Sequence, residues 1–288
     1  MATKLFCDSN CEIWYTELET LNLELIKMPY ILDGKEYAYD CGKETDFDYF
    51  YKRMREGALP TTSALNEYNF TEIFEPVLQN GDDILYIGFS SNLSASFGFM
   101  KQAADKLAEK YPDRRIAYFD TLGISGDCGY QVYYAAKYFN EGHTVDETLE
   151  YLEVLKEKVR TFFVVDDLNH LKRGGRVSSL SAAFGTMLQI KPVLHISEDG
   201  KLEAIDKVKG SKKVMSYFID KMKEMTDAQT LESYRVVIGH ANCEEKAQEL
   251  KGKILEVFPN ADIVISFIGP VVGSHCGEGT VALFFLSK

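Results

Sequence analysis

The stretch ILYIGFSSNLSASFGF, residues 84–99, decides the fold class of this chain. It opens with an apolar run typical of a buried strand, breaks at a serine-rich turn, and continues into a helical pattern. Other strand-like runs alternate with helical patterns in the same way, at residues 5–7, 116–119, 161–165, 235–239 and 262–266. Because strands and helices alternate along the chain, we predict an α/β protein.

The predicted helices begin and end at recognisable residues. Thr45 and Thr144 are each followed three residues later by an acidic residue, which fits a capping box at the start of a helix. Gly57 stands where the first of these helices should end, and Gly142 stands where the helix before Thr144 should end.

The 288 residues are enough for two domains of about 130–160 residues each. We place the boundary after residue 158, giving domains 1–158 and 159–288. Residues 1–158 hold 15 Lys and Arg against 28 Asp and Glu, a net charge of −13, whereas the remainder holds 17 against 16, a net of +1. In the second domain, KPVLHI and LEAIDKV flank a turn at residues 198–201, which predicts a hairpin and therefore a mixed sheet.

The net charge, the lengths of the apolar runs and the spacing of the cysteines argue against several classes of protein. A formal net charge of −12 argues against nucleic acid as the main partner, since nucleic-acid binding relies on a basic surface. Asp8 and Glu12 interrupt the apolar stretch that a signal peptide needs, and no later run approaches the roughly 18 apolar residues of a membrane span, so we expect a cytoplasmic protein. The six cysteines form no C-x-x-C pair, so we expect reduced thiols, no metal and no cofactor.

Two hydroxyl-rich loops are candidates for ligand contact. The first, PTTSALN at residues 60–66, is by itself better explained as a loop whose hydroxyl groups cap the next helix. The second, GFSSNLSASFGF at residues 88–99, follows a strand at the edge of the sheet where ligands usually bind. The helix that it opens offers free N–H groups to a carboxylate or phosphate.

Two further segments carry basic and imidazole groups. The segment at residues 168–194 places three cations around a Gly-Gly bend, which suits an anion or a docking partner, although a solvated basic turn has the same composition. The segment at residues 268–285 is rich in glycine around His275 and Cys276. Neighbours in an extended segment point in opposite directions, so these two side chains are poorly placed to act on each other, whereas His275 can donate to a carboxylate alone.

In this order, the four segments resemble the DegV family of fatty-acid-binding proteins, which serve as acyl carriers for bacterial fatty acid kinase. FCDSN, residues 6–10, resembles the opening strand and Asp-Ser turn of the family. LKRGGRVSSLSAAFGTMLQIKPVLHISEDGKLEAIDKVKGSKK, residues 171–213, is similar to its longest block. The likeness spans nearly the whole chain.

The resemblance implies an N-terminal, mostly parallel, three-layer α/β domain and a C-terminal domain with a mixed sheet. It implies a ligand tunnel near their junction that holds a long-chain fatty acid. The family's carboxylate contacts fall on Thr62, Ser94 and His275, with no catalytic residue. Further ligand or kinase contacts are expected at Ser63, Ser91, Lys172, Arg173, Gly174, Gly175, Arg176 and Gly273.

Several residues depart from the family pattern. Ala64 and Leu65 stand where the family tends to have Gln-Pro, and Ser96 stands where Thr is usual. Glu278 replaces a frequent Pro, and a second carboxylate near a bound one would cost affinity unless it faces away or is protonated.

The leading hypothesis is a carrier that binds a fatty acid and presents its carboxylate to a fatty acid kinase. The tail then supplies the affinity, and the polar groups set the orientation. We expect a monomer that touches a membrane surface at most transiently. The runner-up is a small-molecule hydrolase or phosphoryl-transfer enzyme using His275 with Cys276 or Ser94, and a third hypothesis is a regulatory protein with a vestigial pocket.

Overall fold

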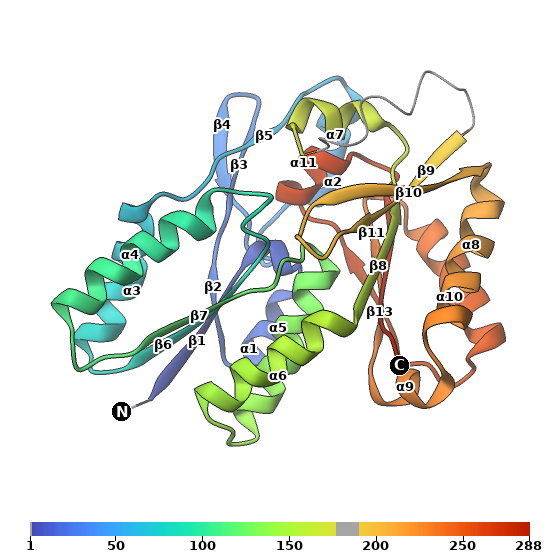
Figure 1. Cartoon of the computed structure of the whole chain (residues 1–288). Coiled ribbons are helices and arrows are strands. Elements are labelled where there is room, and N and C mark those ends of the chain that lie inside the picture. The colour runs from blue at the N-terminus through green and yellow to red at the C-terminus, as the bar shows by residue number, and fades with distance from the viewer. Residues whose placement is uncertain (1, 177–189) are drawn as a thin grey trace.

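The computed structural model describes residues 2–176 and 190–288, and these form three sheets surrounded by helices (Figure 1). The N-terminal sheet is parallel, in the order β2 (Leu23–Ile26), β1 (Thr3–Asp8), β6 (Asp83–Gly88) and β7 (Ile116–Asp120). The C-terminal sheet has the order β10 (Leu202–Lys209), β9 (Ile190–Ile196), β8 (Val159–Val164), β13 (Val281–Leu286), β11 (Val236–His240) and β12 (Ile263–Phe267). A small antiparallel sheet contains β4 (Lys35–Ala38), β3 (Pro29–Leu32) and β5 (Thr61–Thr62).

The C-terminal sheet is mixed, as the hairpin predicted. Strands β11 and β12 pair in parallel, and the other neighbouring strands pair antiparallel. The predicted hairpin is β9–β10, and the six strand-like runs of the sequence all lie in strands of the two large sheets. The predicted α/β class and the mixed second sheet are therefore confirmed.

The helices form layers on both sides of the two large sheets. They comprise η1 (Ser9–Cys11), α1 (Tyr15–Thr20), α2 (Phe47–Arg55), α3 (Glu67–Gln79), α4 (Ser96–Lys110), α5 (Gly126–Asn140), α6 (Val145–Lys158), α7 (Leu168–Gly174), α8 (Ser211–Met225), α9 (Ala228–Ser233), α10 (Glu244–Val257) and α11 (Pro270–Cys276). Figure 1 shows α3 and α4 on one face of the N-terminal sheet and α5 and α6 on the other, with α8 and α10 beyond the C-terminal sheet. Helix α5 also packs against β8, β11 and β13, so it forms a layer shared by both sheets.

The helix ends confirm most of the predicted signals and correct one. Thr144 caps α6 and shares a capping box with Glu147, and both Gly57 and Gly142 adopt positive φ just after their helices. Helix α2 is capped by Asp46, however, and not by Thr45. The Thr45 hydroxyl instead donates to the Asp40 carboxylate at 2.5 Å, which leaves the capping position to the next residue.

The strands of the C-terminal sheet separate two buried cores. Along β8, Phe162 faces the core under α8 and α10, whereas Phe163 faces the core shared with the N-terminal sheet. Along β13, Leu283 and Phe284 alternate in the same way. Because the shared core runs from one sheet to the other, a space left in it lies at the junction of the two halves. The boundary after residue 158 remains our proposal for the domain division.

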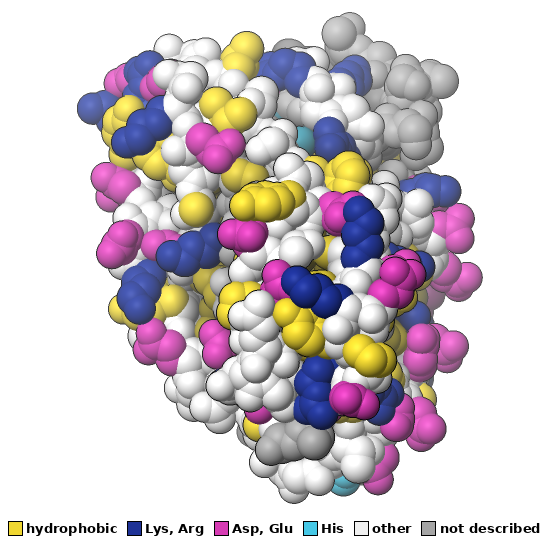
Figure 2. Space-filling model, turned by 90° about the vertical axis from the view of Figure 1, so that its left-hand side faces the viewer, with side chains coloured by type: hydrophobic (Ala, Val, Ile, Leu, Met, Phe, Trp, Pro, Cys, Tyr) yellow, Lys and Arg dark blue, Asp and Glu magenta, His cyan; other side chains and the backbone are white. Residues whose placement is uncertain are grey.

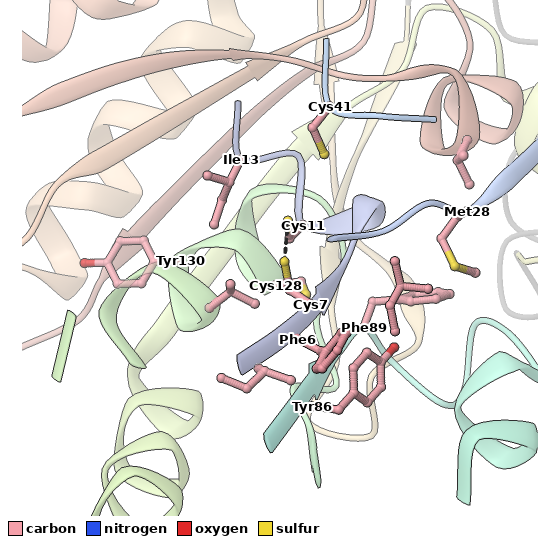
Figure 3. Close-up of a cluster of buried hydrophobic side chains, with 14 of the residues drawn as sticks. Phe6, Cys7, Cys11, Ile13, Met28, Cys41, Tyr86, Phe89, Cys128 and Tyr130 are labelled. Atoms are coloured by element: carbon pink, nitrogen blue, oxygen red, sulfur yellow. Dashed lines mark hydrogen bonds between the residues drawn. The ribbon is translucent and has the colours of Figure 1, made fainter. Parts of the chain in front are cut away.

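Free thiols line part of this shared core. Cys7, Cys11, Cys41 and Cys128 all belong to this core, and Figure 3 shows Cys7, Cys11 and Cys128 close together on the side of Phe6, with Cys41 beyond Cys11. The sulfur atoms of Cys7 and Cys11 are 3.9 Å apart, and all six cysteines of the chain are unbridged.

The surface carries charges of both signs. Figure 2 shows Lys and Arg side chains interspersed with Asp and Glu over the face that carries α3 and α4. Ion pairs join these two helices, for example Lys106 with Glu67 at 2.7 Å and Lys110 with Glu75. Within the described ranges, no helix is both long enough and apolar enough to cross a membrane.

Candidate functional site

A cavity of about 180 Å³ lies between the two large sheets. One enclosed water needs only roughly 10–15 Å³ on the same measure, so the cavity has room for a much larger guest. Most of its wall is apolar, and the side chains there include Met28, Phe89, Leu93, Phe163, Leu202 and Phe284. A largely apolar cavity therefore lies where the resemblance implied a ligand tunnel.

One wall of the cavity carries a polar pair from opposite ends of the chain. Oγ1 of Thr62, in β5, lies 2.8 Å from Nε2 of His275, at the end of α11. Helix α11 packs against both β5 and α7, which brings the predicted Thr62 and His275 together at the cavity. Both side chains are partly buried and line the cavity.

The serine-rich turn supplies a second set of polar groups. The Ser94 hydroxyl donates to Oγ of Ser96 at 3.1 Å, and the N–H of Leu65 donates to the same atom at 3.2 Å. A proline has no N–H, so the departure from Pro at position 65 gives this chain an additional bond that holds the two loops together. Ser94, Ser63 and Ala64 all line the cavity.

His275 is held as a neutral imidazole. Burial, followed by the nearby Arg176 guanidinium, lowers the pKa of His275 to about 4. Arg176 itself lines the cavity, and its Nε donates to the carbonyl of Leu93 at 3.2 Å. The site therefore offers a neutral hydrogen-bonding group and an adjacent permanent cation to an anionic ligand.

The Gly-Gly bend ends α7 and leaves room for His275. A Cβ on Gly174 would stand 2.3 Å from Nδ1 of His275, so only glycine permits this close approach. Gly175 adopts φ +67° at the end of the helix, and its N–H donates to the carbonyl of Lys172 at 3.1 Å. The bend thus has the unusual backbone angles that its sequence predicted.

Not every predicted contact residue reaches the cavity. Lys172 and Arg173 are exposed on the last turn of α7, and Ser91 is exposed beyond the serine-rich turn. Gly273 is buried within α11, where a Cβ would stand 2.6 Å from the hydroxyl oxygen of Tyr51. The hydroxyl- and alanine-rich continuation of the basic segment, residues 177–189, lies outside the described residues.

The carboxylate of Glu278 is paired with an arginine outside the cavity wall. Its carboxylate forms an ion pair with Arg55 of α2 and accepts a hydrogen bond from Asn242 Nδ2 at 2.6 Å. The side chain is not part of the cavity wall. The departure from Pro at this position therefore does not place a second free carboxylate against the ligand space.

The geometry gives little support to the alternative enzyme. Burial raises the pKa of the Cys276 thiol to about 12, which disfavours the thiolate that a nucleophile requires. Ser94 donates to Ser96 and not to His275. Among the described residues, no hydrogen bond or ion pair joins a carboxylate to His275, so the orienting member of a triad is missing from this part of the chain.

Sequence reasoning missed part of the polar wall of the cavity. Ser125 and Thr161 line it, but their hydroxyl groups are directed to buried carboxylates behind the wall. Ser125 donates to Glu12, and Thr161 donates to Asp127 at 2.5 Å. Isolated hydroxyl residues in apolar surroundings gave no signal in the sequence, because their carboxylate partners lie far away along the chain.

Comparisons with known proteins agree on one family. The family described as "Uncharacterised protein, DegV family COG1307" matches residues 2–288. A DegV domain-containing protein of Clostridium perfringens is 37% identical over 282 residues, covering 98% of this chain and 96% of the relative.

Solved structures of similar proteins agree as well. The fatty-acid-binding DegV family protein of Streptococcus agalactiae is 28% identical with a TM-score of 0.86, and the match covers 100% of this chain and 99% of that one. A Thermus thermophilus DegV family protein whose structure concerns fatty acid binding is 26% identical with a TM-score of 0.87, and both chains are covered completely.

Proposed function

The chain belongs to the DegV family, and from this premise we propose that it binds a long-chain fatty acid in the cavity between its two large sheets. The observation that carries the proposal is an apolar cavity that has a cluster of hydroxyl and imidazole groups on one wall. Relatives from Streptococcus agalactiae and Thermus thermophilus that are described as binding fatty acids support it.

The tail supplies the affinity. Transfer of a sixteen-carbon chain out of water gains on the order of 12 kcal/mol at about 0.8 kcal/mol per CH₂, before the costs of association are subtracted. The apolar wall, with residues such as Phe89, Phe163 and Phe284, offers the chain a dry surface of matching character.

Thr62, Ser94 and His275 hold the carboxylate. A buried carboxylate without partners is expensive, and two hydroxyl groups with an imidazole N–H replace the water that it loses. Arg176 adds a positive charge beside them, and a charge-assisted hydrogen bond is stronger than a neutral one. These groups orient the ligand without attacking it.

The protein acts as a carrier and presents the carboxylate to a partner fatty acid kinase. Lys172 and Arg173 stand exposed on the same helix end whose Arg176 reaches the cavity, so a partner that docks there approaches the headgroup. On this proposal the protein has no catalytic residue of its own, works in the cytoplasm as a monomer, and contacts a membrane surface only transiently. The kinase supplies the phosphoryl group, and the carrier supplies the orientation.

Mass spectrometry tests the binding proposal. Denaturing the purified protein should release a long-chain fatty acid in a ratio near one to one. Protein stripped of lipid should take up hexadecanoate or octadecenoate again at the same ratio. A protein that is empty and binds neither acid when offered would contradict the proposal, and a fatty acid hydroxamate or ester turned over by the protein alone would favour the hydrolase.

A further inference from the structure

Glu12 is a buried acid whose side chain reaches two distant parts of the chain. It lies directly after η1, it is 5% exposed, and its φ is +55°. One carboxyl oxygen accepts the N–H of Gly269 at 2.7 Å, and the other contacts the hydroxyl group of Ser125. Its backbone carbonyl accepts the hydroxyl of Ser266 at 3.0 Å. Glu12 therefore joins the start of α5, the end of β12 and the start of α11.

The peptide unit before α11 is held from both sides. Its N–H, on Gly269, donates to Glu12, and its carbonyl, on Ile268, accepts the hydroxyl of Tyr51 at 2.7 Å. All of these bonds are buried, so losing one leaves a group without water to replace it. A Cβ on Gly269 would stand 2.1 Å from the ring of Tyr39, which blocks movement in that direction. The peptide between residues 268 and 269 is thus fixed in place.

Helix α11 connects Gly269 to His275 at the ligand site. It has seven residues, and a helix of that length is not stable alone, so its placement depends on contacts at its two ends. Gly269 is its N-cap, and His275 lies six residues further on, about 9 Å along the axis at 1.5 Å per residue. The backbone between these two residues is held rigidly. The N–H of Gly273 donates to the carbonyl of Gly269 at 2.7 Å, and Pro270 restricts the backbone of the first turn. A shift at Gly269 therefore moves His275.

We propose that Glu12, together with Tyr51, positions the carboxylate-binding site by clamping the peptide between residues 268 and 269 and so fixing His275 opposite Thr62. The inference rests on the proposed function for its effect on ligand affinity, but not for its effect on the position of α11. Neither residue lines the cavity, and both act on the ligand site through other residues, so they are positioning residues.

The surroundings of Glu12 favour its uncharged form. The titratable groups that interact with Glu12 are the thiols of Cys11, Cys41 and Cys276 and the phenols of Tyr39 and Tyr51. Glu12 also lines a second cavity with Glu17, Arg235, His240 and Glu244, where burial lowers the pKa of His240. Burial raises the pKa of Glu12 to about 8. In the protonated acid one oxygen still accepts from Gly269, and the acid O–H can donate to Ser125. A glutamine has the same shape and the same donor and acceptor.

This equivalence defines the variants. Glu12→Gln keeps both contacts, Glu12→Ala removes both, and Tyr51→Phe removes the bond on the other side of the peptide. Asp127→Asn is the control, because Asp127 is an equally buried carboxyl whose partners, Thr161 and Gln131, lie outside α11.

Amide hydrogen exchange in the ligand-free protein tests the clamp. Glu12→Ala and Tyr51→Phe should each speed exchange at Gly269, Gly273 and Gly277 about 10-fold, the change expected for losing one buried hydrogen bond. They should also shift the NMR signals of the His275 ring. Glu12→Gln and Asp127→Asn should leave the exchange of α11 within about 2-fold of the parent protein.

Affinity then tests the consequence for the ligand. Hexadecanoate should bind Glu12→Ala about 10-fold more weakly, and Glu12→Gln should restore parent affinity at pH 7. Unchanged α11 exchange and unchanged His275 signals in both Glu12→Ala and Tyr51→Phe would overturn the clamp. If Glu12→Ala does not fold, Tyr51→Phe decides alone. Faster α11 exchange in a protein that binds no fatty acid would uphold the clamp and reject the proposed function instead.

Discussion

Oγ1 of Thr62 and Nε2 of His275 lie 2.8 Å apart, although 213 residues separate them in the sequence. The contact joins the small sheet of the N-terminal half to a helix of the C-terminal half at the wall of one cavity. Two groups that can each donate or accept a proton face a space large enough for a ligand. The predictions below follow from the position of this pair.

Substitutions in the serine-rich turn should distinguish the serine that binds the ligand from one that does not. Ser94→Ala removes a hydroxyl from the cavity wall, whereas Ser91→Ala removes one that is exposed elsewhere. We expect Ser94→Ala combined with His275→Ala to weaken hexadecanoate binding by about 100-fold or more, since each of the two lost hydrogen bonds to a charged group is worth about 1.5–3 kcal/mol. Titration calorimetry measures the affinity. Parent-like affinity in the double variant, or an equal loss in Ser91→Ala, would remove the headgroup assignment.

Alanine substitutions at the two glycines that end α7 should have different effects, one on ligand affinity and the other on stability. Gly174→Ala places a methyl group 2.3 Å from Nδ1 of His275, so we expect it to displace the ring and weaken fatty acid binding at least about 10-fold. Gly175→Ala meets no atom within 4 Å but strains a backbone with φ +67°, so it should cost about 1 kcal/mol of stability and leave affinity unchanged. Urea unfolding and ligand titration on both variants check this. Equal effects on affinity would show that Gly174 does not protect the position of His275.

The basic residues at the end of α7 should have different roles, one in ligand binding and the other in partner docking. Arg176 lines the cavity and Arg173 is exposed, so Arg176→Glu should weaken fatty acid binding, whereas Arg173→Glu should leave it unchanged. Both should slow acyl phosphate formation by a supplied fatty acid kinase, because a reversed charge repels the surface that it formerly attracted. Lys223→Glu, on the exposed face of α8, is the charge-matched control. Equal transfer rates in Arg173→Glu and the parent would place the docking surface elsewhere.

Glu12 should make the protein less stable as the pH rises above neutrality. Its folded pKa of about 8 exceeds the ordinary value of 4.5, so the folded state holds the proton more tightly. This contribution to stability is complete below about pH 4.5 and is lost as the pH rises to about 8.

Other buried groups also contribute to the pH dependence. Burial raises the pKa of the Cys11 thiol, but its hydrogen bonds with Cys41 and Cys7 lower that pKa well below its ordinary value, so Cys11 acts with opposite sign to Glu12. The raised pKa values of Asp8 and Asp127, about 6, complete the same loss by about pH 6, and the lowered pKa of His275 acts with opposite sign below pH 6.5. Between about pH 6.5 and 8 the contribution of Glu12 should lower the free energy of unfolding by up to about 2 kcal/mol, and Glu12→Gln should remove this contribution from the measured slope. Urea unfolding at the two pH values measures it, and an identical slope in Glu12→Gln would refute the assignment.

The sequence predicted the elements better than the cavity. Apolar runs and turn residues are local signals, and they located six strands of the two large sheets and the β9–β10 hairpin, whereas they did not indicate β2, β3, β4 or β5. At the start of α2, Thr45 and Asp46 are both suitable N-cap residues. The Thr45 hydroxyl donates to the Asp40 carboxylate, so Asp46 caps the helix. A local pattern cannot show a competition with another part of the chain.

The polar residues around the cavity illustrate the same limit. Ser91 and Ser94 belong to one hydroxyl-rich turn, and the path of the backbone alone decides which of them faces the ligand space. Glu12 looks like an ordinary surface acid in the sequence, because its partners Ser125 and Gly269 lie 113 and 257 residues away. The resemblance to the family identified Thr62 and His275, whose contact no spacing in the sequence could indicate.

The most direct test of the account is a crystal structure of the protein with hexadecanoate bound. We predict that the carboxylate oxygens lie within hydrogen-bond distance, roughly 2.6–3.2 Å, of Thr62 Oγ1, Ser94 Oγ and His275 Nε2, with the chain running between the two large sheets. A fatty acid bound with its carboxylate away from all three atoms, or bound outside this cavity, would contradict the account.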